Sequence, residues 1–117
     1  HFVQGHVDEV GQITEIKPDG EATLVDISCS QQLLTYIVEK GFITIEGVSL
    51  TVVSVNANGF QVTLIPFTRT HTTLGSRDVG SPVNLEVDIL AKYVERILAQ
   101  SERSSGHALM DVRETRR

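Results

Sequence analysis

The chain has 117 residues, of which 40% are hydrophobic and 21% are charged, a composition typical of one globular domain. Its formal net charge of -5 argues against nucleic-acid binding, because a surface that follows phosphates needs clustered Lys and Arg. No apolar run approaches the roughly 20 residues of a membrane-spanning helix, and the single cysteine, Cys29, excludes an intrachain disulfide and favours a reducing compartment.

The first third of the sequence predicts a hairpin and a short helix. The sequence begins at His1 rather than Met, so we expect either a removed leader or a piece of a longer chain. Residues 1–16 predict one or two strands bent at a glycine, residues 17–20 (Lys-Pro-Asp-Gly) a turn, and residues 22–28 a strand with one buried face. Residues 31–39 predict a helix that Ser30 caps and that carries one apolar stripe.

A second hairpin is predicted at the centre of the chain, with strands at 42–45 and 48–55. Its turn is Glu46-Gly47, where Gly47 accepts a positive φ but Glu46 is less favourable than Asn or Asp. If Leu50 points into the core, Ser49 and Thr51 project together from the opposite face. Two such hydroxyls can hold a polar, planar ligand, although their spacing alone favours simple hydration of an exposed sheet face.

The remaining residues predict two more strands and a terminal helix. Asn58-Gly59 predicts a turn into a strand at 60–65 that Pro66 ends, followed by a loop at 68–80 with at most one turn of helix. Residues 82–87 predict the last strand, and Asp88 caps a helix from 89 to about 100 that carries a wide apolar stripe. About six short strands favour an all-β fold, a small antiparallel barrel over residues 1–100, with residues 101–117 as a disordered polar tail.

The histidines and the cysteine are candidates for chemistry. His1, His6 and Asp8 do not have a standard zinc spacing, so we expect no metal. His6 is suited to proton transfer, although an isolated histidine is more often a surface or structural residue. Cys29 lies at a strand end beside Ile27, which favours a buried structural thiol over a nucleophile.

Several motifs, in the same order and at similar spacing, closely resemble riboflavin synthase and more narrowly the second of its two homologous barrel halves. The resemblance runs from residue 1 to about residue 98, and the stretch from residue 101 onward carries no family motif. The motifs are His1-Phe2-Val3-Gln4-Gly5-His6-Val7-Asp8, Lys40-Gly41, Gly47-Val48-Ser49-Leu50-Thr51-Val52, Leu64-Ile65-Pro66, Thr72-Thr73-Leu74-Gly75 and Val83-Asn84-Leu85-Glu86-Val87-Asp88.

The resemblance implies a six-stranded antiparallel Greek-key β-barrel, doubled in the full protein, with homotrimers held largely by C-terminal helices. The implied reaction is the dismutation of two 6,7-dimethyl-8-ribityllumazine molecules by four-carbon transfer, which gives riboflavin and 5-amino-6-ribitylaminouracil without a cofactor. The two substrates meet where an N-terminal barrel of one subunit joins a C-terminal barrel of its neighbour. We therefore expect neither nucleic acid nor membrane as a partner, and a cytoplasmic protein, with a plastid as the alternative.

The resemblance also assigns site residues. His6, supported by His1, becomes the candidate base for the acidic ring methyl, and Ser49 is a catalytic-site contact that replaces the cysteine of the other half. Asp88 is either a site residue or a helix cap alone. The residues expected to contact the substrate are Gly5, His6, Val7, Lys40, Ser49, Leu50, Thr51, Leu64, Ile65, Pro66, Phe67, Thr68, Arg69 and Asp88.

Two departures from the family pattern leave alternatives open. Phe67 stands where many bacterial members have an acidic residue, and the N-terminal barrel is missing, so we expect the isolated chain to be weakly active or inactive. The first alternative is a non-catalytic lumazine- or flavin-binding protein of the same fold. The second is an oligomerisation module that uses the terminal helix.

Overall fold

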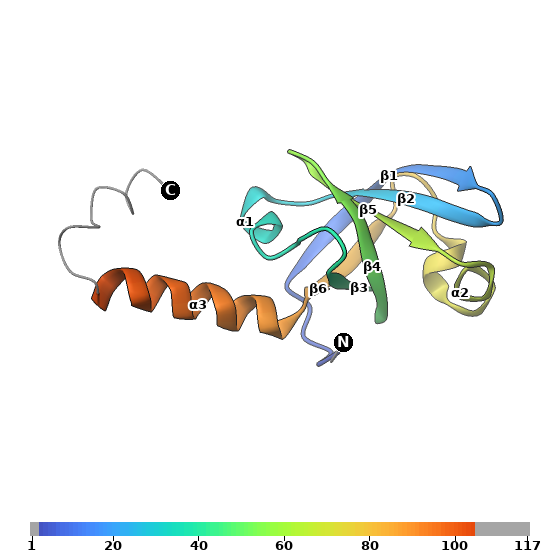
Figure 1. Ribbon diagram of the computed structural model, residues 1–117. Coiled ribbons are helices and arrows are strands. Elements are labelled where there is room, and N and C mark those ends of the chain that lie inside the picture. Colours follow the sequence, from blue (N-terminus) through green and yellow to red (C-terminus); the bar gives the residue numbers. More distant parts are fainter. Residues whose placement is uncertain (1–2, 105–117) are drawn as a thin grey trace.

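Six strands build the domain in the computed structural model, which describes residues 3–104. They form a closed antiparallel barrel in the order β1-β2-β5-β4-β3-β6 (Figure 1), so the predicted all-β, six-stranded antiparallel barrel is confirmed. The strands are β1 (Glu9–Asp19), β2 (Ala22–Ser28), β3 (Phe42–Ile45), β4 (Val48–Val55), β5 (Gly59–Leu64) and β6 (Pro82–Val87). Closure matters because it leaves no exposed sheet edge among these strands.

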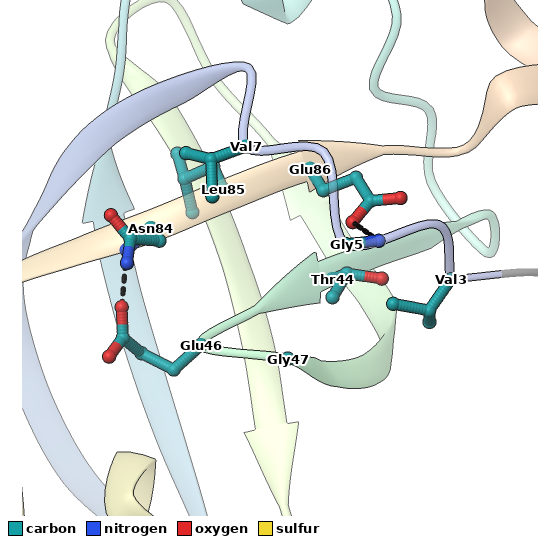
Figure 2. A pocket seen from close by; sticks show the side chains of 9 residues that line it. All are labelled: Val3, Gly5, Val7, Thr44, Glu46, Gly47, Asn84, Leu85 and Glu86. Atoms are coloured by element: carbon teal, nitrogen blue, oxygen red, sulfur yellow. Dashed lines mark hydrogen bonds between the residues drawn. The ribbon is translucent and has the colours of Figure 1, made fainter.

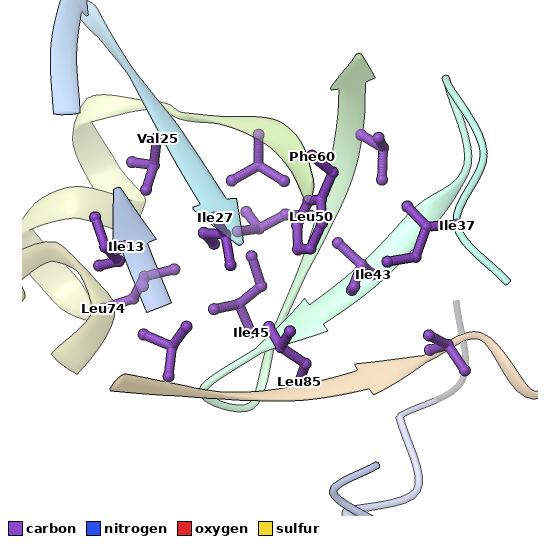
Figure 3. Packing of buried hydrophobic residues seen from close by; sticks show 14 of the residues in the cluster. Ile13, Val25, Ile27, Ile37, Ile43, Ile45, Leu50, Phe60, Leu74 and Leu85 are labelled. Carbon is purple, nitrogen blue, oxygen red and sulfur yellow. The ribbon is translucent and has the colours of Figure 1, made fainter. Parts of the chain in front are cut away.

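The interior of the barrel is filled by the inward side chains of every strand (Figure 3). Alternation along each strand sends every second side chain inward, where β-branched and aromatic residues fill the volume. Val25 and Ile27 of β2 are buried, which gives this strand the single buried face that was predicted, and Leu50 and Val52 of β4 are buried as well. Ser49 and Thr51 consequently face outward and are exposed, which confirms the predicted division of this strand.

Two predicted boundaries in the first third of the chain are wrong. The predicted turn at 17–20 begins too early, because Pro18 and Asp19 still pair with Thr23 and Ala22, and the reversal occurs at Gly20 and the residue after it. The predicted helix at 31–39 is only α1 (Gln31–Leu34), although the Ser30 hydroxyl caps it by accepting a bond from Leu33 N at 3.1 Å.

The helix α1 ends early because local bonds turn the chain away from it. The Thr35 hydroxyl donates to the Gln32 carbonyl at 2.7 Å, and Tyr36 N donates to Leu33 O at 3.0 Å in a tighter i−3 pattern. Ile37 still reaches the core, but Val38, which was expected on the same apolar stripe, is exposed.

The central hairpin forms as predicted. Ile45 pairs with Val48, and the two turn residues both have positive φ, +50 for Glu46 and +79 for Gly47. This is the conformation of a type I′ turn, whose twist matches that of the flanking strands.

Residues 66–76, predicted mostly as loop, are largely helical. Pro66 ends β5 but also begins α2 (Pro66–His71), because the first helical position needs no N–H donor. A 3-10 turn, η1 (Thr73–Ser76), follows and packs on α2 so tightly that a Cβ at Gly75 would lie 1.7 Å from the Arg69 carbonyl oxygen. The two elements cover one end of the barrel (Figure 1).

The chain leaves the barrel through α3 (Ile89–Ser104), which runs four residues past the predicted end at Gln100. Asp88 caps the helix as predicted, since its Oδ1 accepts a bond from Leu90 N at 3.1 Å. The helix projects away from the barrel (Figure 1), and its predicted apolar stripe is largely exposed. The rest of the predicted tail, residues 105–117, lies outside the described residues. Of the helices described, none has the length and apolar character needed to cross a membrane.

Candidate functional site

A polar row crosses the outer face of three neighbouring strands. Thr44 of β3 pairs with Glu86 of β6 on one side and with Ser49 of β4 on the other. Directly paired residues of antiparallel strands point to the same face, and the neighbours Ile43 and Ile45 point into the core. The three polar side chains therefore lie side by side on the outside of the barrel.

The N-terminal segment, residues 3–8, lies across this row. The Glu86 carboxylate accepts a bond from Gln4 N at 2.8 Å and another from Gly5 N at 3.1 Å, the second of which is drawn in Figure 2. Asp8 is fixed a few residues later, because its N–H donates to Leu85 O at 2.8 Å and its carboxylate accepts from Val87 N at 2.8 Å. As a result Glu86 is only 7% exposed and Thr44 only 2%, although both are on the outer side of the sheet.

A hollow of about 270 Å³ lies between the N-terminal segment and the β3–β4 turn (Figure 2). Of the predicted site residues, Gly5 and Val7 line it. The bend near the chain start and the hairpin that carries Ser49 therefore meet on one side of the barrel. The full lining is Val3, Gly5, Val7, Thr44, Glu46, Gly47, Asn84, Leu85 and Glu86.

The other predicted contacts of these two segments do not line the hollow. His6 lies between Gly5 and Val7 with an exposed side chain, and Ser49 and Thr51 are exposed on the adjacent strand. Leu50 points into the core, so only its backbone is available to a ligand on the outer face. His1 lies outside the described residues.

The end of β5 borders the same outer face on its other side. The β4–β5 ladder includes the pair Val52 and Val62, and because the strands are antiparallel, Ile65 lies toward the Ser49 end of β4. Ile65 and Phe67 are exposed, whereas Leu64 is buried in the core.

Around the first turn of α2 the predicted contacts diverge. Phe67 stacks on His71 with ring centroids 4.1 Å apart. Pro66 and Thr68 belong to the first turn of the helix. Arg69 turns away toward the end of the barrel, where its Nη1 donates to Thr23 Oγ1 at 3.2 Å. The structure therefore places Ile65 beside the Ser49 end of β4, stacks Phe67 on its own helix and directs Arg69 to the end of the barrel.

Lys40 is held in an unusual backbone conformation beside β4. Its φ is +67, which is uncommon for a residue with a side chain. Two backbone bonds fix this geometry, from Lys40 N to Val52 O at 2.8 Å and from Val52 N to Gly41 O at 2.9 Å. Since Phe42 pairs with Thr51, the exposed Lys40 side chain starts close to the predicted ligand face. Strained backbone of this kind clusters at functional sites.

The remaining candidates for chemistry among the described residues are a cluster of metal ligands and the thiol of Cys29. Within residues 3–104, no group of three or more His, Cys, Asp or Glu side chains has the geometry to hold a metal ion. Burial and, to a lesser extent, the nearby charge of Glu9 together raise the pKa of the Cys29 thiol to about 11. This favours the structural role predicted for Cys29, because a thiol of high pKa is a poor nucleophile at neutral pH.

Sequence reasoning missed the residues at the centre of the row, Thr44 and Glu86. A signal for both exists, since each occupies an outward position between two apolar residues of its strand. The sequence alone does not show that β3 pairs with β6, which brings together two residues 42 positions apart. It also does not show that the N-terminal segment covers them.

Comparison with curated proteins connects this geometry with a family. Residues 4–88 match the lumazine binding domain family. The chain is 50% identical over 98 residues to a riboflavin synthase of Actinobacillus pleuropneumoniae, an alignment that covers 84% of this chain and 46% of that protein. A riboflavin synthase of Schizosaccharomyces pombe is 42% identical over 101 residues, with 84% and 48% covered. The chain spans about half the length of the curated relatives that it matches.

Two solved structures with a similar fold are complexes of a protein named LumP. A crystal structure of LumP complexed with riboflavin is 26% identical with a TM-score of 0.68, and covers 74% of this chain and 46% of that one. A complex of LumP with 6,7-dimethyl-8-(1'-D-ribityl) lumazine is 25% identical with a TM-score of 0.64, with 74% and 47% covered. With the family match extending over most of the barrel, the chain belongs to the lumazine binding domain family.

Proposed function

We propose that this chain supplies the C-terminal half-site of a riboflavin synthase. The proposed reaction transfers four carbons between two 6,7-dimethyl-8-ribityllumazine molecules and gives riboflavin and 5-amino-6-ribitylaminouracil, without a cofactor. The observation that carries the proposal is the meeting of the Gly5-His6-Val7 segment and the Ser49-Leu50-Thr51 strand on one outer face of the barrel. The identity of 50% to curated riboflavin synthases supports it.

The proposed ligand lies on the outer face of β3 and β4. A flat heterocycle needs hydroxyls and backbone amides at its polar edge, and we assign these to Ser49, Thr51 and the backbone of residues 64–68. Phe67 would form a wall beside the ring. The ribityl chain carries several hydroxyls, and Lys40 would bind it from its fixed position beside Val52.

The proposed chemistry begins with the removal of a proton from the acidic ring methyl. His6 is the proposed base, because imidazole is suited to proton transfer near neutral pH and because its neighbours Gly5 and Val7 line the hollow. Holding two substrates face to face would supply much of the rate enhancement through orientation. Ser49 acts here as a ligand contact and not as a nucleophile. His1 keeps its proposed supporting role, and Asp88 combines its capping bond with a place near the site.

The proposed assembly is larger than this chain. The second substrate would bind the N-terminal barrel of a neighbouring subunit, in a homotrimer held through α3. The exposed apolar stripe of that helix supports the trimer, and the strand order β1-β2-β5-β4-β3-β6 supports a Greek-key description. A cytoplasmic location, or a plastid, fits the pathway that the proposed reaction serves.

Riboflavin titration tests the half-site directly. We expect the fluorescence of riboflavin to change saturably on addition of the chain, and we expect little riboflavin to form when the chain is incubated with 6,7-dimethyl-8-ribityllumazine alone. Turnover close to that of an intact two-barrel enzyme would show that a partner barrel is unnecessary. Absence of saturable binding to either molecule would overturn the assignment.

A second candidate function is a non-catalytic flavin- or lumazine-binding protein. The complexes of LumP with riboflavin and with the ribityl lumazine favour it, since they share this fold. A full-length protein that contains this barrel separates the two: bound lumazine without riboflavin formation indicates the binder, and riboflavin formation indicates the synthase.

A further inference from the structure

The Glu86 carboxylate is buried although its side chain points to the outer face of the barrel. Glu86 lies between Leu85 and Val87, which both point into the core, so its own side chain points outward. It is nevertheless 7% exposed, because the N-terminal segment covers it. Burying a carboxylate is costly unless strong donors replace water, and a position on the outer face of a barrel offers water freely.

The donors are two successive backbone N–H groups. Oε2 accepts from Gln4 N at 2.8 Å and Oε1 from Gly5 N at 3.1 Å, so each carboxylate oxygen accepts one backbone N–H. Gly5 has φ +77, and the two successive N–H groups converge on one carboxylate, the concave arrangement of amides known as a nest. Here the anion that fills the nest comes from a strand 81 positions away in the chain.

The segment is held again three residues after Gly5. Asp8 bonds to the backbone of β6 through both its N–H and its carboxylate, at 2.8 Å in each case. Lys92 of α3 also contacts the Asp8 carboxylate. Only His6 and Val7 lie between the two attachment points, so the position of the His6 ring depends on both of them.

We propose that Glu86 is a positioning residue that fixes His6 and the Gly5–Val7 wall against the ligand face. The effect on ligand binding rests on the proposed function, because the Gly5–Val7 segment is a ligand wall only if a ligand binds here. The bonds from Gln4 N and Gly5 N to the Glu86 carboxylate, which we call the clamp, do not depend on that function. Glu86 touches backbone amides of the segment and is not assigned any contact with the substrate.

Three variants of the 117-residue chain test the clamp. Glu86→Gln keeps the shape but places an amide donor against one of the two N–H groups, which removes at least one charge-assisted bond. Gly5→Ala attacks the same nest from the other side: a Cβ there has open space, so the variant opposes only the positive φ. Glu15→Gln is the matched control, an exposed carboxylate on β1 that pairs only with Lys17 in the described residues.

The first readout is amide exchange at Gln4 and Gly5, measured by NMR. We expect exchange at least ~10-fold faster in Glu86→Gln and in Gly5→Ala than in the parent chain or in Glu15→Gln. The double variant should exchange little faster than the single variants, because both changes disable one clamp. Unchanged exchange in Glu86→Gln would overturn the clamp, whether or not the chain binds riboflavin.

The second readout is ligand binding, with riboflavin as the probe. We expect the Kd to rise roughly 10-fold in Glu86→Gln, and the riboflavin-induced shift of the His6 ring protons to disappear, while Glu15→Gln keeps both. Faster amide exchange with an unchanged Kd and an unchanged His6 shift would overturn the positioning role. If the parent chain itself fails to bind riboflavin, the proposed function fails, and the exchange measurement still decides the clamp.

Discussion

Glu46 and Arg77 form an ion pair at 2.7 Å between the β3–β4 turn and the segment that follows η1. The same Glu46 carboxylate accepts a second bond from Asn84 N at 2.6 Å. These bonds explain why glutamate occupies a turn position with φ +50 that Asn or Asp would adopt more easily. Glu46 therefore links β3 to β6 and to the end of the barrel, and the stabilisation from these side-chain bonds exceeds the cost of its unfavourable backbone conformation.

Glu46→Ala should lower the free energy of unfolding by about 2–3 kcal/mol, because it removes a largely buried carboxylate together with its two charge-assisted bonds. Glu46→Gly loses the same bonds but relieves the left-handed backbone, so it should be about 1 kcal/mol less damaging. Urea unfolding measures both. Glu15→Ala, which removes an exposed pair with Lys17, should change stability by less than about 0.5 kcal/mol. Equal effects of the alanine variants at 46 and 15 would contradict this account.

Two glycines should respond differently to alanine. At Gly47 a Cβ has open space, and the cost arises only from φ +79, so Gly47→Ala should destabilise by about 1–2 kcal/mol. At Gly59 a Cβ would lie 1.9 Å from the Ile27 carbonyl oxygen and 2.9 Å from the Ser28 Cα. Both atoms belong to the backbone of β2 and cannot move without breaking its ladder with β5, so Gly59→Ala should cost more than about 3 kcal/mol. Thermal or urea unfolding decides, and similar losses in the two variants would refute the distinction.

The central hairpin shows how much of the fold the sequence predicts. Alternation along residues 48–55 is a local property, and it correctly sends Leu50 inward and Ser49 outward. Helix length was harder to predict, because the apolar stripe at 31–39 continues past Leu34 while the backbone turns at Thr35. The motifs predict candidate site residues, but the contact of Glu86 with Gly5 depends on two segments 81 positions apart. Local patterns carry no information about which distant strand becomes a neighbour.

Cys29 should react slowly with alkylating reagents. Burial, together with the nearby charge of Glu9, raises the pKa of its thiol from 9.0 to about 11, so less thiolate is present at any pH below that value. At pH 8 the alkylation rate should be on the order of 10- to 100-fold below that of an unhindered thiol, and it should keep rising up to about pH 11 instead of levelling near pH 9. Labelling in urea provides the control, because unfolding exposes the thiol and should restore the ordinary rate. A folded chain that labels as fast as the unfolded one would contradict the prediction.

The outward hydroxyls of β4 should serve ligand binding and not stability. Ser49→Ala and Thr51→Ala should each raise the Kd for riboflavin about 3- to 10-fold, the effect of one lost hydrogen bond. Both side chains are exposed, so the free energy of unfolding should change by less than about 0.5 kcal/mol. Thr14→Ala is the matched control, since Thr14 is an exposed hydroxyl on β1. A comparable loss of affinity in Thr14→Ala would indicate a non-specific effect.

The terminal helix should mediate self-association. Tyr93 and Ile97 are 57% and 62% exposed on the apolar stripe of α3, one turn apart on the same helical face. Apolar residues gathered on an exposed helix face are a typical association surface, so the chain should sediment as an oligomer. Replacing both residues with lysine should shift it to a monomer without changing the riboflavin Kd, because the proposed ligand face lies on β3 and β4. Glu95→Lys changes the net charge by the same two units at an exposed position on the opposite side of α3 and should leave the oligomer intact. Sedimentation velocity measures all three chains, and a parent chain that is already monomeric would remove α3 from the proposed assembly.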